Sequence, residues 1–142
     1  MSVLLAIQMH ALYYWLIAGI LSILLQAPRS LVTPHLPSFV ACITALCSLT
    51  VKNHGHLPSS LPVRSRSHNL VQICHGSPGL LLLLAIFRTR FPQEWRKEWD
   101  TAEEFANEAL WKEGLVLKGL GICHGVAGNA WPWLLQSRVR RG

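Results

Sequence analysis

Two short Cys-His motifs hold the side chains of this sequence that are best suited to chemistry. Residues 73–79 read ICHGSPG, and residues 122–128 repeat the pattern as ICHGVAG, with five of the seven positions identical. Thiolate and imidazole are together suitable ligands for Zn²⁺. Because repeats place equivalent turns at neighbouring positions, and glycine permits tight turns, we expect the two motifs to converge on one metal ion.

The donor set leaves two ways of filling such a site. All four side chains, Cys74, His75, Cys123 and His124, can close a structural centre, or three can bind and leave one position for water or substrate. A site of two thiolates and one imidazole is soft, and it can hold a substrate thiol as thiolate at neutral pH. The alternative is that the cysteines are small buried hydrophobic residues, but the repeat favours the metal.

The residues between the motifs predict a pair of helices. Residues 79–90 contain five consecutive leucines and end on basic side chains, which favours a buried helix over a strand. From Pro92 to a stop at Gly114, apolar side chains recur at intervals of three and four, as in an amphipathic helix. They are Trp95, Trp99, Ala102, Ala106, Ala109 and Leu110. The acidic side chains between Glu94 and Glu113, including Glu103, are expected to form a solvated face.

The N-terminal part fits the same scheme of helix hairpins. Residues 3–26 would form a buried helix, residues 27–37 a proline-rich connection, and residues 38–52 a second helix. Residues 53–69 contain several Pro and Ser residues and predict a long polar loop. The second helix would place three apolar side chains on one face, namely Phe39, Ile43 and Leu46. The sequence therefore predicts an all-α, repetitive fold whose hairpins need neighbours to stack on.

Other cysteines and histidines receive simpler interpretations. Cys42 and Cys47 lie on the predicted second helix, where packing in the core is expected. His54 and His56 resemble a two-histidine metal pair, but they lie in the polar loop and are expected to be solvated.

Composition limits the class of protein. The chain has 142 residues, of which 51% are hydrophobic and 14% charged, and this excludes a disordered or collagen-like chain. Four cysteines are too few for a disulfide scaffold. The net charge is +6, yet no nucleic-acid-binding motif accompanies it, so we expect no nucleic-acid partner. The apolar run 11–25 is shorter than the roughly 20 residues of a membrane span, so a buried helix is favoured over a small membrane anchor.

The two motifs resemble the paired signature of the lanthionine synthetase C-like family, closest to its eukaryotic branch. Residues 74–79 read CHGSPG and residues 117–130 read LKGLGICHGVAGNA, and the resemblance extends over about 18–136, leaving the tail 137–142 unmatched. It implies an α/α toroid of helix hairpins with one Zn²⁺ ion. The implied ligands are Cys74, Cys123 and His124. His75 would lie beside the metal, and Asn129 would cap or hydrogen-bond the turn.

The resemblance also implies a reaction and its partners. Bacterial members add a peptide cysteine across dehydroalanine or dehydrobutyrine, and eukaryotic members bind glutathione and add it to such residues in damaged proteins. Zinc would lower the pKa of the thiol, and an acid must protonate the enolate that follows addition. We therefore expect a thiol such as glutathione and a peptide or protein that contains a dehydroamino acid as partners.

The catalytic acid is not identified. The family pattern places a histidine in a third, degenerate copy of the motif, where this chain reads WLIAGI from Trp15 to Ile20. An indole cannot supply that proton, and nothing in their spacing singles out His10 or His68 as a substitute. A protein that binds zinc and glutathione without chemistry is therefore the alternative.

The extent of the match predicts one partial domain over residues 1–142. The family ring has seven hairpins, and three hairpins cannot close it, so we expect an incomplete ring with apolar edges from a truncated product or an incomplete gene model. Activity would be impaired by that truncation. Cytoplasmic localisation is expected, with peripheral association with the plasma membrane as a further possibility because the chain is basic.

Overall fold

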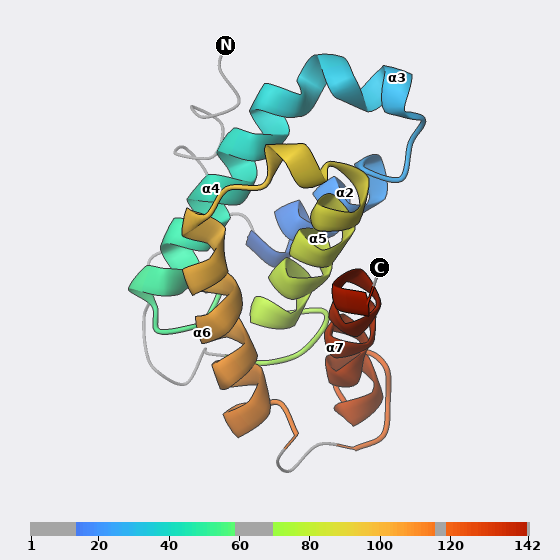
Figure 1. Cartoon of the computed structure of the whole chain (residues 1–142). Helices are drawn as coiled ribbons and strands as arrows, with labels where there is room; N and C mark the ends of the chain where they lie inside the picture. The colour runs from blue at the N-terminus through green and yellow to red at the C-terminus, as the bar shows by residue number, and fades with distance from the viewer. Residues whose placement is uncertain (1–13, 59–69, 116–118, 142) are drawn as a thin grey trace.

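The computed structural model describes residues 14–58, 70–115 and 119–141 (Figure 1). The regular elements in these ranges are helices, apart from an isolated bridge between Gln72 and His75. The α-helices are α2 (Tyr14–Leu24), α3 (Arg29–Val32), α4 (Leu36–Lys52), α5 (Ser77–Arg90), α6 (Glu98–Glu113) and α7 (Val126–Arg141). Two short 3-10 helices, η1 (Thr33–His35) and η3 (Pro92–Glu94), complete the elements. The predicted all-α class is confirmed.

The helices form two rows that alternate along the chain. Helix α5 packs against α2 on one side and α7 on the other, which makes an inner row of three. Helices α4 and α6 pack against each other and cover α5, which makes an outer row (Figure 1). The α5 leucines at 80, 81, 83 and 84 are fully buried between these helices, whereas Leu82 and Ile86 are partly exposed. This burial explains a helix that is apolar all round.

Aromatic residues join the outer row to the inner one. Trp99 of α6 is fully buried and meets the ring of Phe87 edge-on, with the centroids 5.2 Å apart. Its indole Nε1 donates a 3.0 Å hydrogen bond to Thr44 Oγ1 of α4. The apolar stripe predicted for α6 is thus the face that packs on α4 and α5. Trp95, the first residue of that stripe, lies before α6 in extended backbone.

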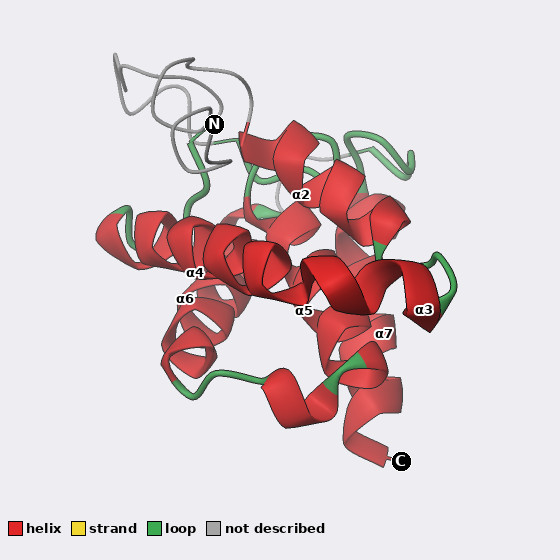
Figure 2. Ribbon diagram, turned by 90° about the horizontal axis from the view of Figure 1, so that it is seen from above, coloured by secondary structure: helices red, strands yellow, loops and turns green. Residues whose placement is uncertain are grey.

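The prediction of a proline-rich connection over residues 27–37 is wrong. Helical backbone runs from Arg29 to Lys52, and Figure 2 shows α3 and α4 following each other across the molecule. Pro34 and Pro37 each lie in the first turn of their helix, where the missing N–H group costs no hydrogen bond. Residues 3–13 of the first predicted helix and residues 59–69 of the predicted loop lie outside the described residues.

The acidic face of α6 is not uniformly solvated, as had been expected. Glu103 is buried, with side chains of α5 and α7 bonded to its carboxylate. Its Oε2 lies 3.1 Å from Arg88 Nη1, and its Oε1 accepts a 3.1 Å hydrogen bond from Gln136 Nε2 of α7. Ion pairing and hydrogen bonding together satisfy a carboxylate that burial alone would penalise.

The loop after α4 also departs from its predicted solvation. His54 is exposed, but His56 is buried and its Nε2 lies 3.1 Å from Glu113 Oε1 at the end of α6. Gly55 has a φ of 91°, and a Cβ there would lie 2.2 Å from the carbonyl oxygen of Phe105. The glycine lets the loop pack directly on α6, which buries His56.

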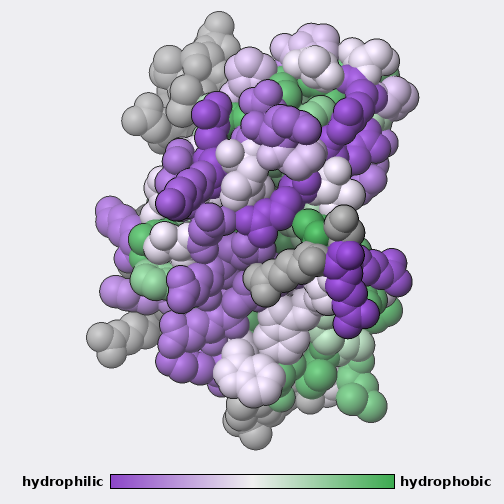
Figure 3. Space-filling view, in the orientation of Figure 1, coloured by the Kyte–Doolittle hydropathy of each residue, from purple (hydrophilic) through white to green (hydrophobic). Residues whose placement is uncertain are grey.

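Apolar side chains are exposed at both ends of the inner row. On α2 the exposed residues include Ile20, Ile23 and Leu24, and on α7 they include Trp131 and Leu134. Figure 3 shows hydrophilic side chains over α6 and a hydrophobic region at the lower right, beside α7. Apolar edges of this kind are typical of stacked helical repeats, in which each repeat packs against its neighbours.

One described helical segment is long and apolar enough to cross a membrane. It is Arg29–Lys52, of 24 residues with a mean hydropathy of 1.5. Its side chains Phe39, Ile43 and Leu46, which were predicted to share one face, are buried in the core. The core helices of globular proteins pass the same test of length and composition.

Candidate metal centre

The sequence repeat is also a structural repeat. Cys74 and Cys123 are 49 residues apart, and the same offset relates the first residue of α5, Ser77, to the first residue of α7, Val126. Each Cys-His pair therefore occupies the turn that leads into its helix. Because α5 packs against α7, the two turns lie side by side.

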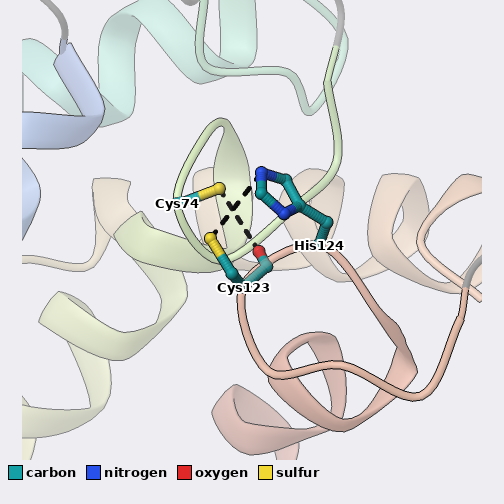
Figure 4. Close-up of side chains that lie close together, drawn as sticks. All are labelled: Cys74, Cys123 and His124. Carbon is teal, nitrogen blue, oxygen red and sulfur yellow. Dashed lines mark hydrogen bonds between the residues drawn. The ribbon is translucent and has the colours of Figure 1, made fainter.

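Three side chains from these turns point toward one another (Figure 4). One donor atom each from Cys74, Cys123 and His124 lies within 4.8 Å of the others. Cys74 Sγ donates a 3.2 Å hydrogen bond to the carbonyl oxygen of Cys123, and Cys123 Sγ lies 3.6 Å from His124 Nε2. Cys74 is half-buried, whereas Cys123 and His124 are exposed. The cluster is thus closed on the protein side and open toward solvent.

Glycines fix the shape of both turns. A Cβ at Gly76, whose φ is 102°, would lie 1.9 Å from the carbonyl oxygen of Leu70. In the second turn, a Cβ at Gly125 would lie 2.2 Å from the carbonyl oxygen of Gly119. Both carbonyls lie six residues before their glycine, so in each turn the backbone passes close to the glycine. Only glycine allows this approach without moving backbone.

The donor set fits zinc. Around a tetrahedral ion with Zn–S of about 2.3 Å and Zn–N of about 2.0–2.1 Å, ligand atoms lie roughly 3.5–3.8 Å apart. The separation of 3.6 Å between Cys123 Sγ and His124 Nε2 agrees with this value. Two sulfurs and one imidazole nitrogen favour a soft or borderline ion over Mg²⁺ or Ca²⁺. The exposed side of the cluster leaves room for one further ligand.

The sequence matches the family model of the lanthionine synthetase C-like proteins over residues 17–139, a range that contains all three side chains of the cluster. The chain belongs to the lanthionine synthetase C-like family. The alternating inner and outer helices are accordingly part of an α/α toroid, the fold of this family. The match also includes the first three residues of the tail 137–142, and α7 continues through that tail to Arg141.

Two eukaryotic relatives illustrate the extent of the similarity. Glutathione S-transferase LANCL1 of Danio rerio is 31% identical over 98 residues, which is 68% of this chain and 22% of that protein. LanC-like protein GCL1 of Arabidopsis thaliana is 34% identical over 123 residues, 87% of this chain and 27% of that protein. The chain thus corresponds to about a quarter of the length of the relatives that it matches.

The remaining predicted site residues of this lanthionine synthetase C-like chain lie outside the three-donor cluster. His75 is half-buried, and its backbone N–H and carbonyl form the two hydrogen bonds of the bridge with Gln72, at 3.0 and 2.9 Å. Asn129 is fully buried in the first turn of α7. Its amide hydrogen-bonds to Val71 and Gly114, two partners that sequence reasoning did not identify. Gly114 had been recognised only as a helix stop.

The degenerate third motif does not form a comparable turn. Residues 15–20 lie inside α2, whereas His75 and His124 lie in turns before their helices. A Cβ at Gly19 would meet no atom within 4 Å, in contrast to the crowded glycines of the other turns. Trp15 therefore belongs to helical backbone, and no proton-donating role is assigned to it. His10 and His68 lie outside the described residues.

Cys42 and Cys47 are buried in the core, as expected. Burial raises the pKa of Cys47 to about 12, with further contributions from Glu103 and Glu98. Burial also raises the pKa of Cys42 above its ordinary value. Both remain neutral thiols across the physiological range.

We predict that iodoacetamide distinguishes the two kinds of cysteine in the folded, metal-free chain. Cys74 and Cys123 should be alkylated at pH 8, because their thiols are reached by solvent. Cys47 should stay unmodified from pH 7 to 10, since a pKa of about 12 leaves roughly 1% thiolate even at pH 10. Peptide mass spectrometry measures the extent at each site, with alkylation in denaturant as the control. Equal rates at Cys47 and Cys123 in the folded chain would contradict the assignment.

Proposed function

We propose that this chain binds one Zn²⁺ ion through Cys74, Cys123 and His124, and that it uses the site to add a thiol to a dehydroamino acid. The observation that carries the proposal is the convergence of these three donors from two repeated turns. When bound, zinc would act as a Lewis acid that stabilises the thiolate form of a substrate thiol at neutral pH.

The residues of the chain supply the setting for that chemistry. The exposed side chains of Cys123 and His124 leave one face of the cluster open to a thiol. Helices α5 and α7 begin three residues after Cys74 and Cys123 respectively, so the positive ends of two helix dipoles lie near the cluster. These ends favour negative charge, which a thiolate brings.

Glutathione is the thiol that we propose, and a dehydroalanine or dehydrobutyrine residue in a peptide is the acceptor. The name of the Danio rerio relative, a glutathione S-transferase, supports glutathione. In the addition, the thiolate sulfur forms a bond to the β-carbon of the alkene. The alkene electron pair moves toward the carbonyl, and the α-carbon then takes up a proton. Atoms and charge balance without an oxidant or a leaving group.

A second candidate function is binding of zinc and glutathione without addition. Trp15 favours it, because an indole N–H is too weak an acid to protonate the α-carbon. In this candidate the metal cluster is the same, and only the last proton transfer is missing or slow.

Incubation of zinc-loaded chain with glutathione and a dehydroalanine peptide tests the proposal. We expect a peptide that gains the mass of one glutathione, with the rate above background lost in Cys123→Ala. Zinc binding with no rate above background would support the binding function instead. A folded wild-type chain that binds no zinc would contradict both functions.

A further inference from the structure

We infer that Asn129 is a positioning residue that holds the two ligand turns at the separation that a shared metal ion requires. The inference rests on the proposed metal function, but it concerns the protein framework. Asn129 lies on α7 five residues after His124 and is fully buried. Its complete burial excludes direct contact with a dissolved substrate.

The amide group of Asn129 links three segments of the chain. Its Nδ2 donates one hydrogen to the carbonyl oxygen of Gly114 at 2.7 Å and the other to the carbonyl oxygen of Val71 at 2.8 Å. An amide nitrogen carries two hydrogens, so both are used. Gly114 ends α6, and Val71 leads into the turn that carries Cys74. One side chain of the second repeat thus fixes the approach of the first turn.

The position of these bonds explains why they affect the site. Val71 is buried and lies three residues before Cys74, next to the Gln72–His75 bridge that shapes the turn. Asn129 lies in the same helical turn as Gly128, whose ideal Cβ position is 3.1 Å from Ile73 Cγ2 of the first turn. A displacement of Val71 would therefore change the distance between Cys74 and the Cys123–His124 pair.

The repeat has no equivalent of this amide in the first motif. The residue 49 positions before Asn129 is Leu80, which packs in the core. The Asn129 link therefore has no counterpart at the equivalent position of the first repeat. Without it, the carbonyl groups of Val71 and Gly114 would lose a buried hydrogen-bond donor, and such groups are costly to leave unpaired.

A matched control is available in Asn107. Its Nδ2 donates to the carbonyl oxygen of Glu103 at 2.8 Å, and its Oδ1 accepts a 2.8 Å hydrogen bond from Trp133 Nε1. Asn107 therefore also joins α6 to α7 through an amide, but its bonds are not to the turns. Asn107→Asp and Asn129→Asp make the same chemical change at the two places.

The test uses cross-linking of the metal-free 142-residue chain with dibromobimane, a short reagent that becomes fluorescent when it bridges two thiols. The wild-type chain should cross-link Cys74 to Cys123, and a Cys74→Ser chain should not. Asn129→Asp, whose carboxylate repels both carbonyl groups, should slow cross-linking at least about tenfold, since small displacements have large effects on such reactions. Asn129→Ser, which keeps one hydrogen-bond donor, should cross-link at a rate between those of the wild type and Asn129→Asp. Asn107→Asp should cross-link within about twofold of wild type.

Zinc affinity, measured by chelator competition, is the second readout. We expect Asn129→Asp to lower it by roughly 10–100-fold, the usual effect of removing a residue that supports metal ligands. Wild-type cross-linking rates in Asn129→Asp would overturn the inference. Equal slowing in Asn107→Asp, at an equal loss of melting temperature, would also overturn it. If the wild-type chain cross-links and Asn129→Asp slows the reaction as expected, but the wild-type chain binds no zinc, the inference stands and the proposed metal function is contradicted.

Discussion

Cys123→Ala is expected to bring the zinc content of the purified chain from about one ion to nearly none, and Cys74→Ala is expected to do the same. Each substitution removes one of three protein donors that lie within 4.8 Å of one another. Structural zinc sites with four ligands bind with about 10–16 kcal/mol, so one ligand corresponds to roughly a hundredfold to a thousandfold in affinity. Metal analysis after gel filtration measures the loss.

The control for this experiment is His75→Ala. His75 lies next to Cys74 in sequence, yet it does not belong to the cluster of three donors among the described residues. We expect this variant to keep about one zinc ion. A large loss of zinc in His75→Ala would favour the closed, four-ligand site. Retention of zinc in both cysteine variants, with helical content preserved by circular dichroism, would contradict the assignment of the ligands.

Much of the candidate metal centre could be predicted from sequence because the information is local and repeated. The two motifs share glycines as well as ligands, and each motif immediately precedes an apolar helix. Turn shape and helix start are therefore set within a few residues. The pairing of the turns follows from packing of the two helices, α5 on α7. Because the motif is repeated and the two helices pack together, the residues of both turns can be expected to lie close in space.

Other features depend on contacts that sequence patterns do not carry. Glu103 has the spacing of a solvated residue on α6, but α7 covers it and Arg88 compensates its charge. His56 lies in a polar segment, but packing of Gly55 against Phe105 buries it. The proline-rich segment reads as a connection because proline usually ends helices, whereas here its prolines occupy first turns. For Glu103 and His56, the residue that causes the burial is distant in sequence. For the prolines, the sequence does not show whether they end a helix or begin one.

The role of Asn129 shows the same limit within the site. Its place just after the second motif suggests a hydrogen bond to the turn that it follows. Its acceptors, however, are the carbonyl groups of Val71 and Gly114, 58 and 15 residues away. Backbone carbonyls have no sequence signature, so a side chain that bonds to them can be recognised only once the fold is known.

Gly128→Ala is expected to lower the stability of the fold strongly, although helix propensity alone would favour alanine over glycine. Gly128 lies in the first turn of α7, and a Cβ there would lie 1.7 Å from the carbonyl oxygen of Ile122 and 2.7 Å from its carbonyl carbon. Both obstructing atoms are backbone, so no side chain can rotate away. We expect a loss of about 3 kcal/mol in the free energy of unfolding, near the upper end for single substitutions.

The repeat supplies the matched control for this substitution. Gly79 holds the equivalent position in α5, but its Cβ would lie 3.6 Å from the carbonyl oxygen of Ile73, an ordinary contact. Gly79→Ala should therefore be neutral or slightly stabilising, because alanine is favoured over glycine inside a helix by about 1 kcal/mol. Gly19→Ala of α2, where no atom lies within 4 Å, should behave likewise. Urea unfolding of the three variants measures the differences.

Zinc binding by the same variants separates an effect on the fold from an effect on the site. Ile122 directly precedes Cys123, so the displacement that Gly128→Ala forces on the Ile122 carbonyl must also move a ligand. We expect this variant to lose zinc affinity under conditions where it is still folded, while Gly79→Ala keeps it. If Gly128→Ala proved as stable as Gly79→Ala and bound zinc equally well, the close approach of Gly128 to the Ile122 backbone in the second turn would be contradicted.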